Sequence, residues 1–159
     1  MSTALERLKE ERKLFRKERQ EGFTAKPATS KNGDLNLFKW TCRIPGLKNT
    51  PFEDGSFIVE LIFTSRYPEE PPKAIFRPPL FHVNVYDDGI VCLSLLDASL
   101  DWKPSVSVNT VLKSLQALLN NPNIDSPANA EAMKIFKLNR KRYDNRIRSI
   151  VKAQIESNQ

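Results

Sequence analysis

The feature that most constrains this chain is a change of pattern near residue 77. From Arg77 to Pro104 the sequence shows neither the alternation typical of a strand nor the spacing typical of a helix. Strand-like segments precede this stretch, and helix-like segments follow it. That order predicts an α+β fold: an N-terminal helix, a four-stranded antiparallel meander, a long irregular segment, then C-terminal helices. Because long loops in compact domains are usually functional, we expect the irregular segment to carry the active site.

Three of the four strands can be placed from the sequence. We expect them over residues 35–44, 56–63 and 73–76. The first of them has one face of large or apolar side chains, which we expect to lie in the core: Phe38, Trp40, Cys42 and Ile44. Prolines on both sides keep the third strand short, because proline cannot donate to a sheet ladder.

Two helices frame the chain. The first is expected over residues 3–20, with Ser2 or Thr3 as its N-cap. Its apolar edge consists of Leu5, Leu8 and Phe15. The last is expected over residues 140–156, with an inward face of Tyr143, Ile147, Ile150 and Val151.

Two more helices are expected between the irregular segment and the last helix. Over residues 108–119 apolar side chains return at helical spacing, and Asn121-Pro122-Asn123 ends that helix. Ser126-Pro127 is typical of an N-cap followed by proline at the first helical position. It therefore predicts a helix that opens there and runs to about residue 139.

Composition excludes several classes of protein. With 159 residues, 40% of them hydrophobic, the chain suits one globular domain, which we place at residues 1–159. No apolar run is long enough to span a bilayer, and we expect no secretory signal and no membrane partner. Cys42, Cys92 and the single His82 lack the spacing of a zinc site, so we expect free thiols in a reducing compartment and no metal. The formal charge of +6 favours an acidic partner, either protein or nucleic acid.

The candidate chemistry lies around Cys92. A lone cysteine is more often a small buried hydrophobic residue than a nucleophile. A reactive thiol needs solvent access and polar neighbours, and His82 and Asn84 lie upstream on the same irregular segment. Spacing alone does not mark His82 as a base, and a single histidine is more often structural.

A long collinear set of motifs resembles the ubiquitin-conjugating enzyme family. The first three are Tyr67-Pro68-Glu69-Glu70-Pro71-Pro72-Lys73, Phe81-His82-Val83-Asn84-Val85-Tyr86 and Gly89-Ile90-Val91-Cys92-Leu93-Ser94-Leu95-Leu96. The later two are Asp101-Trp102-Lys103-Pro104 and Asn121-Pro122-Asn123. Within the family, the first helix and the loops at 45–53 and 96–102 are most similar to the SUMO-conjugating branch.

The resemblance implies a role for each matching residue. Cys92 would accept the C-terminal glycine of the tag as a thioester, which a target lysine then attacks. Asn84 would donate its side-chain amide to the oxyanion, and His82 would hold the loop rather than act as a base. Desolvation against Tyr86 would favour the neutral amine of the incoming lysine.

Four positions depart from the family pattern. Val83 replaces a proline between His82 and Asn84, which removes a fixed φ. Asp88 and Ile90 replace small hydroxyl residues that, together with the lysine at position 73, read an acidic residue of the acceptor motif. We expect Asp88 to oppose Lys73 and weaken that reading. Ser126 replaces an aspartate that orients the amine, with Asp125 one place earlier; both are kept as candidates.

The first helix segregates its charges. One broad band carries Lys9, Arg12, Lys13, Arg16 and Lys17. A solvated face is the simplest alternative, but segregation favours a docking surface for acidic protein patches. The resemblance implies that Arg12, Lys13, Arg16 and Lys17 bind SUMO and its activating enzyme. The last helix is also basic, and we interpret it as a solvated face because stacking aromatic residues are missing.

The resemblance implies a SUMO-conjugating transferase. By resemblance its partners are SUMO, the activating enzyme, SUMO ligases and targets with acceptor lysines. It would bind no cofactor, since the activating enzyme uses the ATP, and it would be a monomer in nucleus and cytoplasm with no specific nucleic acid. The alternatives are a ubiquitin carrier, a non-catalytic scaffold of the same fold, and a basic nucleic-acid-binding module.

Overall fold

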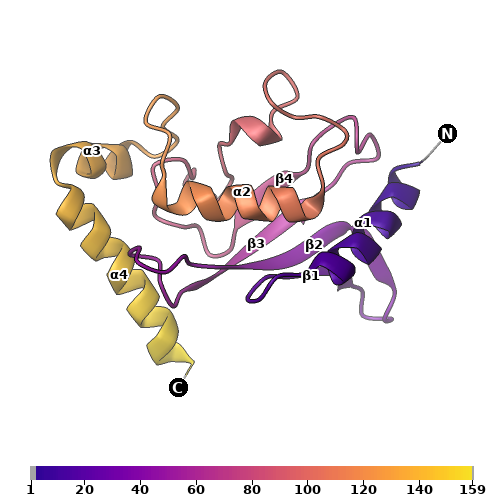
Figure 1. Ribbon diagram of the computed structural model, residues 1–159, viewed down its shortest axis with the longest axis horizontal. Coiled ribbons are helices and arrows are strands. Elements are labelled where there is room, and N and C mark those ends of the chain that lie inside the picture. The colour runs from indigo at the N-terminus through magenta and orange to yellow at the C-terminus, as the bar shows by residue number, and fades with distance from the viewer. Residues whose placement is uncertain (1–2, 159) are drawn as a thin grey trace.

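A computed structural model describes residues 3–158 and confirms the α+β fold (Figure 1). In chain order the elements are α1 (Ala4–Glu18), β1 (Thr24–Thr29), β2 (Leu35–Pro45), β3 (Ser56–Ile62), β4 (Lys73–Phe76), the short 3-10 helix η1 (Ser94–Leu96), α2 (Val108–Asn120), α3 (Ala130–Leu138) and α4 (Arg140–Ser157). Helix α1 lies at one end of the long axis of the molecule, and α3 and α4 lie at the other (Figure 1).

The sheet is an antiparallel meander in the order β1-β2-β3-β4. Strands β2, β3 and β4 lie within one residue of the predicted bounds. Strand β1 has no sequence signal of its own, since it contains Pro27 and no large apolar side chain. Its register with β2 shifts between Pro27 and Ala28, as expected where a proline cannot donate to the ladder.

Helix α2 covers the sheet and supplies much of the core. Its predicted apolar stripe is buried throughout: Val108, Val111, Leu112, Leu115, Leu118 and Leu119. It packs on β2, where Trp40, Cys42 and Ile44 are fully buried and Phe38 is partly buried. The side-chain amide of Gln116 also donates to the carbonyl of Pro45, 2.9 Å away, and fixes the helix against the strand end.

Helix α1 begins as predicted, but one of its apolar residues faces outward. Thr3 is the N-cap, and its hydroxyl and the Glu6 carboxylate form a capping box. Ser2 lies outside the described residues. Leu8 and Phe15 are buried, whereas Leu5 is 41% exposed, so the inward placement of Leu5 was wrong. Ala4 occupies the inward position of the first turn, and Leu5 lies about 100° away around the helix.

Helix α3 begins later than Ser126-Pro127 predicts, and that prediction is wrong. The N-cap is Asn129, whose side chain accepts from the amide of Ala132 at 3.0 Å. The amides of Ala128 and Asn129 both donate to the carbonyl of Val83, so residues 126–129 are held by the irregular segment instead of by a helix.

In α4, Tyr143, Ile147 and Val151 are buried as expected, while Ile150 is only partly buried.

A buried carboxylate joins the first helix to the second. Glu11 accepts from the backbone amide of Val108 at 2.7 Å, at the N-terminus of α2. Its other oxygen accepts from Nε of Arg7 at 3.2 Å, and Arg7 also donates to the carbonyl of Val106. A carboxylate at a helix N-terminus satisfies an amide with no partner inside the helix and complements the helix dipole.

Replacing Glu11 should therefore destabilise the protein. Glu11→Ala leaves the buried amide of Val108 without an acceptor and Arg7 without its partner. We expect the free energy of unfolding, measured by urea denaturation, to fall by about 2–3 kcal/mol. The matched control is Glu10→Ala, because Glu10 is exposed on the same helix. Equal losses in the two variants would contradict the assigned role of Glu11.

Candidate active site

The irregular segment is held against the edge of the sheet. The amide of Phe76 donates to the carbonyl of Gly89, and the amide of Val91 donates to the carbonyl of Ala74. Gly89 has φ +93°, and a Cβ there would clash with the carbonyl oxygen of Phe76. The turn before Cys92 therefore requires glycine. Residues 89–91 lie antiparallel to β4, so Cys92 follows next to the beginning of that strand.

Cys92 lies half-buried in a groove of about 690 Å³. Its backbone amide donates to the carbonyl of Asn84 at 2.8 Å. The groove is also lined by Glu70, Pro71, Tyr86, Leu100, Asn123 and Ser126, among others. Cys42 is fully buried in β2, and burial raises the pKa of its thiol to about 12. Of the two thiols, only that of Cys92 can reach a partner from solution.

His82 is a structural histidine. Its Nδ1 accepts from the backbone amide of Asn84 at 3.0 Å, so the ring proton sits on Nε2. Nε2 then donates to the carbonyls of Leu118 and Leu119, at 2.9 Å and 3.1 Å, in the last turn of α2. Burial lowers the pKa of His82 to about 4, although the two carbonyl bonds raise it. The predicted loop-holding role fits this geometry, with both ring nitrogens in use.

The side chain of Asn84 is buried and fastens the segment that faces Cys92. Its amide nitrogen donates to the carbonyls of Asn123 and Ser126, at 2.8 Å and 2.9 Å. Its oxygen accepts from the amide of Asn123 at 2.8 Å. Both amide protons are used, so donation to an oxyanion would require Asn84 to release one carbonyl. The oxyanion role of Asn84 stays a prediction.

The other predicted residues divide into two groups. Tyr86, which is 47% exposed, and Ser126 line the groove, whereas Asp125 does not. Lys73, Asp88 and Ile90 lie outside it as well. The Asp88 carboxylate accepts from the amide of Ile90 at 3.1 Å. Among residues 3–158 no direct ion pair joins Asp88 to Lys73, and the expected effect of the Asp88 charge on acceptor reading stays a prediction.

From the sequence, Asn123 was expected only to help end a helix. In the structure Asn123 lines the groove and bonds to Asn84 through both its amide and its carbonyl. Its side chain also accepts from the amide of Asp125. The partners are 39 residues apart in sequence, so no local pattern could have shown this role.

The loop across the groove is held in part by Trp102, whose indole donates to the carbonyl of Pro68 at 2.8 Å.

Within residues 3–158 no group of three or more His, Cys, Asp or Glu side chains could hold a metal ion. No helix in this part of the chain is both long and apolar enough to cross a membrane.

The fold and the groove around an accessible cysteine define a known class of proteins. The profile of the ubiquitin-conjugating enzymes matches residues 7–151, and the chain belongs to that family. It is 51% identical over 142 residues to the SUMO-conjugating enzyme UBC9 of Caenorhabditis elegans, covering 89% of this chain and 86% of that protein. It is 46% identical over 143 residues to the Sumo-conjugating enzyme ubc9 of Dictyostelium discoideum, covering 90% of each.

The geometry of His82 predicts a pH dependence of stability. Its pKa is about 4 in the fold and about 6.5 in an unfolded chain, so the unfolded state takes up the proton first as pH falls. Stability should therefore be lost between pH 6.5 and pH 4, by about 2 kcal/mol from pH 7 to pH 5.

Denaturation of the protein and of His82→Gln at both pH values isolates this contribution, since the variant should show a smaller pH slope. The chain has one histidine, so its imidazole resonances are unambiguous in NMR spectra. They should shift only slightly from pH 7 to pH 5, because little of the buried ring is protonated there. A titration midpoint near pH 6.5 would contradict the buried neutral ring.

Proposed function

We propose that this protein is a SUMO-conjugating enzyme that carries SUMO as a thioester on Cys92 and transfers it to lysine side chains. The observation that carries the proposal is the contrast between the two thiols: Cys92 opens into a groove, and Cys42 is buried in the core. Two relatives of about the same length, at 51% and 46% identity, are SUMO-conjugating enzymes by name.

The transfer takes place in two acyl exchanges. The Cys92 thiolate attacks the carbonyl carbon of the tag's terminal glycine on the activating enzyme, and the activating enzyme's own cysteine leaves as a thiolate. An incoming lysine amine then attacks the Cys92 thioester, the Cys92 thiolate leaves, and the amine loses a proton as the isopeptide bond forms. ATP is consumed upstream, so this chain needs no cofactor of its own.

The walls of the groove suit the second exchange. The attacking lysine must lose its charge, and apolar walls such as Leu96 and Leu100, together with the ring of Tyr86, disfavour the ammonium form. Asn84 would hold residues 123–126 in place and, on releasing a carbonyl, could donate to the oxyanion. Ser126 lies in the groove beside the expected path of the amine; Asp125 would act only after a shift of its loop.

Helix α1 provides the proposed docking surface for SUMO and the activating enzyme. Arg12, Lys13, Arg16 and Lys17 form no ion pair with any carboxylate in the described residues. Their charges are free to meet an acidic partner. We further propose that the protein works as a monomer in nucleus and cytoplasm, together with SUMO ligases and target proteins. Because Cys92 is accessible from solution, we favour a SUMO carrier over a non-catalytic scaffold of the same fold.

The first test separates the two cysteines and the two possible tags. The protein is mixed with ATP and either SUMO with its activating enzyme or ubiquitin with its own. We expect a reductant-sensitive adduct on a non-reducing gel with SUMO only, lost in Cys92→Ser and kept in Cys42→Ser. Ubiquitin loading would favour a ubiquitin carrier, and a reductant-sensitive adduct that persists in a folded Cys92→Ser variant would contradict Cys92 as the nucleophile.

The second test addresses the basic band of α1. Arg12→Glu, Arg16→Glu and Lys17→Glu together should slow loading about tenfold at low salt, because steering between charged surfaces is lost. Discharge of preloaded protein to lysine should not change. The control makes the same reversals at Lys141, Arg142 and Arg148 of α4, so both variants have the same net charge. If loading slows equally in the α1 and α4 variants, the basic band of α1 is only a solvated face.

A further inference from the structure

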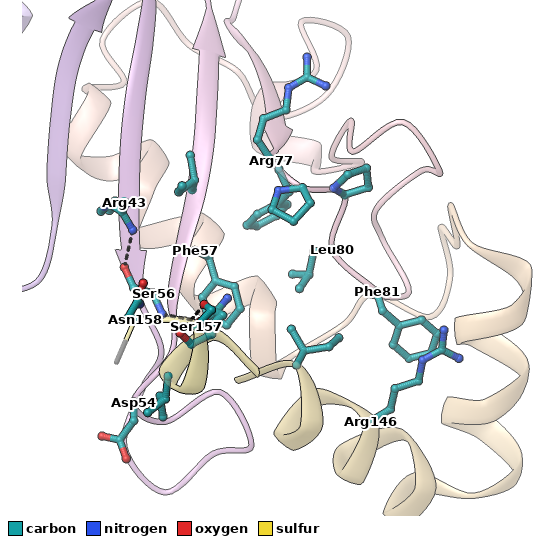
Figure 2. Close-up of a pocket in the computed structure, with 17 residues that line it drawn as sticks. Arg43, Asp54, Ser56, Phe57, Arg77, Leu80, Phe81, Arg146, Ser157 and Asn158 are labelled. Atoms are coloured by element: carbon teal, nitrogen blue, oxygen red, sulfur yellow. Dashed lines mark hydrogen bonds between the residues drawn. The ribbon is translucent and has the colours of Figure 1, made fainter. Parts of the chain in front are cut away.

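A second groove, of about 510 Å³, lies between α4 and the sheet (Figure 2). We call it the α4 groove. Its walls come from β2, β3, the connection from β4 to His82, and the last helix. It shares no lining residue with the Cys92 groove. It also lies at the end of the molecule opposite α1 and its basic band (Figure 1).

The floor of the α4 groove is apolar. Phe57 and Leu80 are buried beneath it, and Ile150, which was expected to face the core, is instead partly open to it. Pro78 and Pro79 are exposed on one wall, and Ile155 is 41% exposed on another. A concave apolar site of this volume with a few polar groups at its rim is typical of a ligand pocket and accommodates one or two large side chains.

The charges at the rim are unequal in number and in position. The lining includes three arginines, Arg43, Arg77 and Arg146, and one acidic residue, Asp54. Figure 2 shows Arg146 and Phe81 at one end of the groove, and Ser157 and Asn158 at the other. The end with Ser157 is the C-terminus of α4, whose dipole disfavours an anion. A carboxylate is therefore favoured toward Arg77 and Arg146.

Both of these arginines retain free donors. Arg77 uses Nε on Glu60 at 3.1 Å, and Glu60 also pairs with Lys39, so its charge is shared. Arg146 uses one terminal nitrogen on Glu131, which is largely exposed, and its guanidinium stacks 3.9 Å from the centre of the Phe81 ring. Stacking fixes the plane of the guanidinium and leaves its other N–H groups for a partner.

We propose that the α4 groove binds a short, extended, acidic segment of a partner protein. One Leu- or Phe-sized side chain of that segment lies on Leu80 and Ile150, and its carboxylates pair with Arg77 and Arg146. Because the two grooves share no residue, such a partner can be held while the groove at Cys92 is occupied. The proposal depends on the groove alone and does not require the function proposed for Cys92.

The test uses the full chain and a fluorescein-labelled peptide, Leu-Phe-Asp-Glu-Asp, together with the peptide of reversed order. Binding is followed by anisotropy, and the site is mapped by ¹⁵N NMR. We expect saturable binding with amide shifts at Leu80, Phe81 and Ile150. Arg77→Gln with Arg146→Gln should weaken binding about tenfold, the sum of two exposed charge pairs. Replacing Leu-Phe in the peptide by Ala-Ala should weaken it about tenfold as well.

The matched control removes two positive charges elsewhere, with Lys137→Gln and Arg142→Gln, and should change the affinity less than about twofold. Shifts confined to α1 would show that the peptide binds the basic band instead, and would overturn the proposal. So would equal losses in the control variant, equal binding of the Ala-Ala peptide, or no binding of either order at about 1 mM.

Discussion

The active site depends on one imidazole. His82 accepts from Asn84 and donates to the last turn of α2, where helix carbonyls have no partner inside the helix. The carbonyl of Asn84 then holds the amide of Cys92, and the Asn84 side chain holds residues 123–126. Cys92 and the facing wall of its groove are thus both tied to the end of α2, which is itself packed on the sheet. The polar groups in these bonds are buried. Removing one partner therefore leaves another donor or acceptor without a hydrogen bond.

Most of the fold could be predicted from local patterns, and the errors have physical causes. Strand β2 and helix α2 alternate or repeat their apolar residues, so their bounds were close. Strand β1 is formed by pairing with β2, because Thr24–Thr29 buries little and has no pattern of its own. Ser126-Pro127 offers a good N-cap, yet the carbonyl of Val83 takes the following amides and delays the helix to Asn129. Long-range hydrogen bonds outweighed local propensity there.

The sequence predicted which residues belong to the site better than it predicted the hydrogen bonds between them. The family motifs located Cys92, Asn84, His82 and Tyr86, but the commitment of the Asn84 amide to carbonyls 39 and 42 residues away has no local signature. The effect of Asp88 on Lys73 stays a prediction, and the bond from the amide of Ile90 to the Asp88 carboxylate was not foreseen. Short polar side chains readily bond to nearby backbone, and such bonds compete with ion pairs between exposed groups.

The burial of Cys42 has a practical consequence. Its thiol lies in the middle of β2 against α2, so an alkylating reagent can reach it only when the core opens. Cys92 lines an open groove in the native state, so we expect it to react first, and the chain has no other cysteine. In one labelling time course, the extent of the first modification, at Cys92, would measure the fraction of molecules with an accessible thiol. The rate of the second, at Cys42, would report how often the core opens. The protein thus contains its own paired probes of activity and of conformational stability.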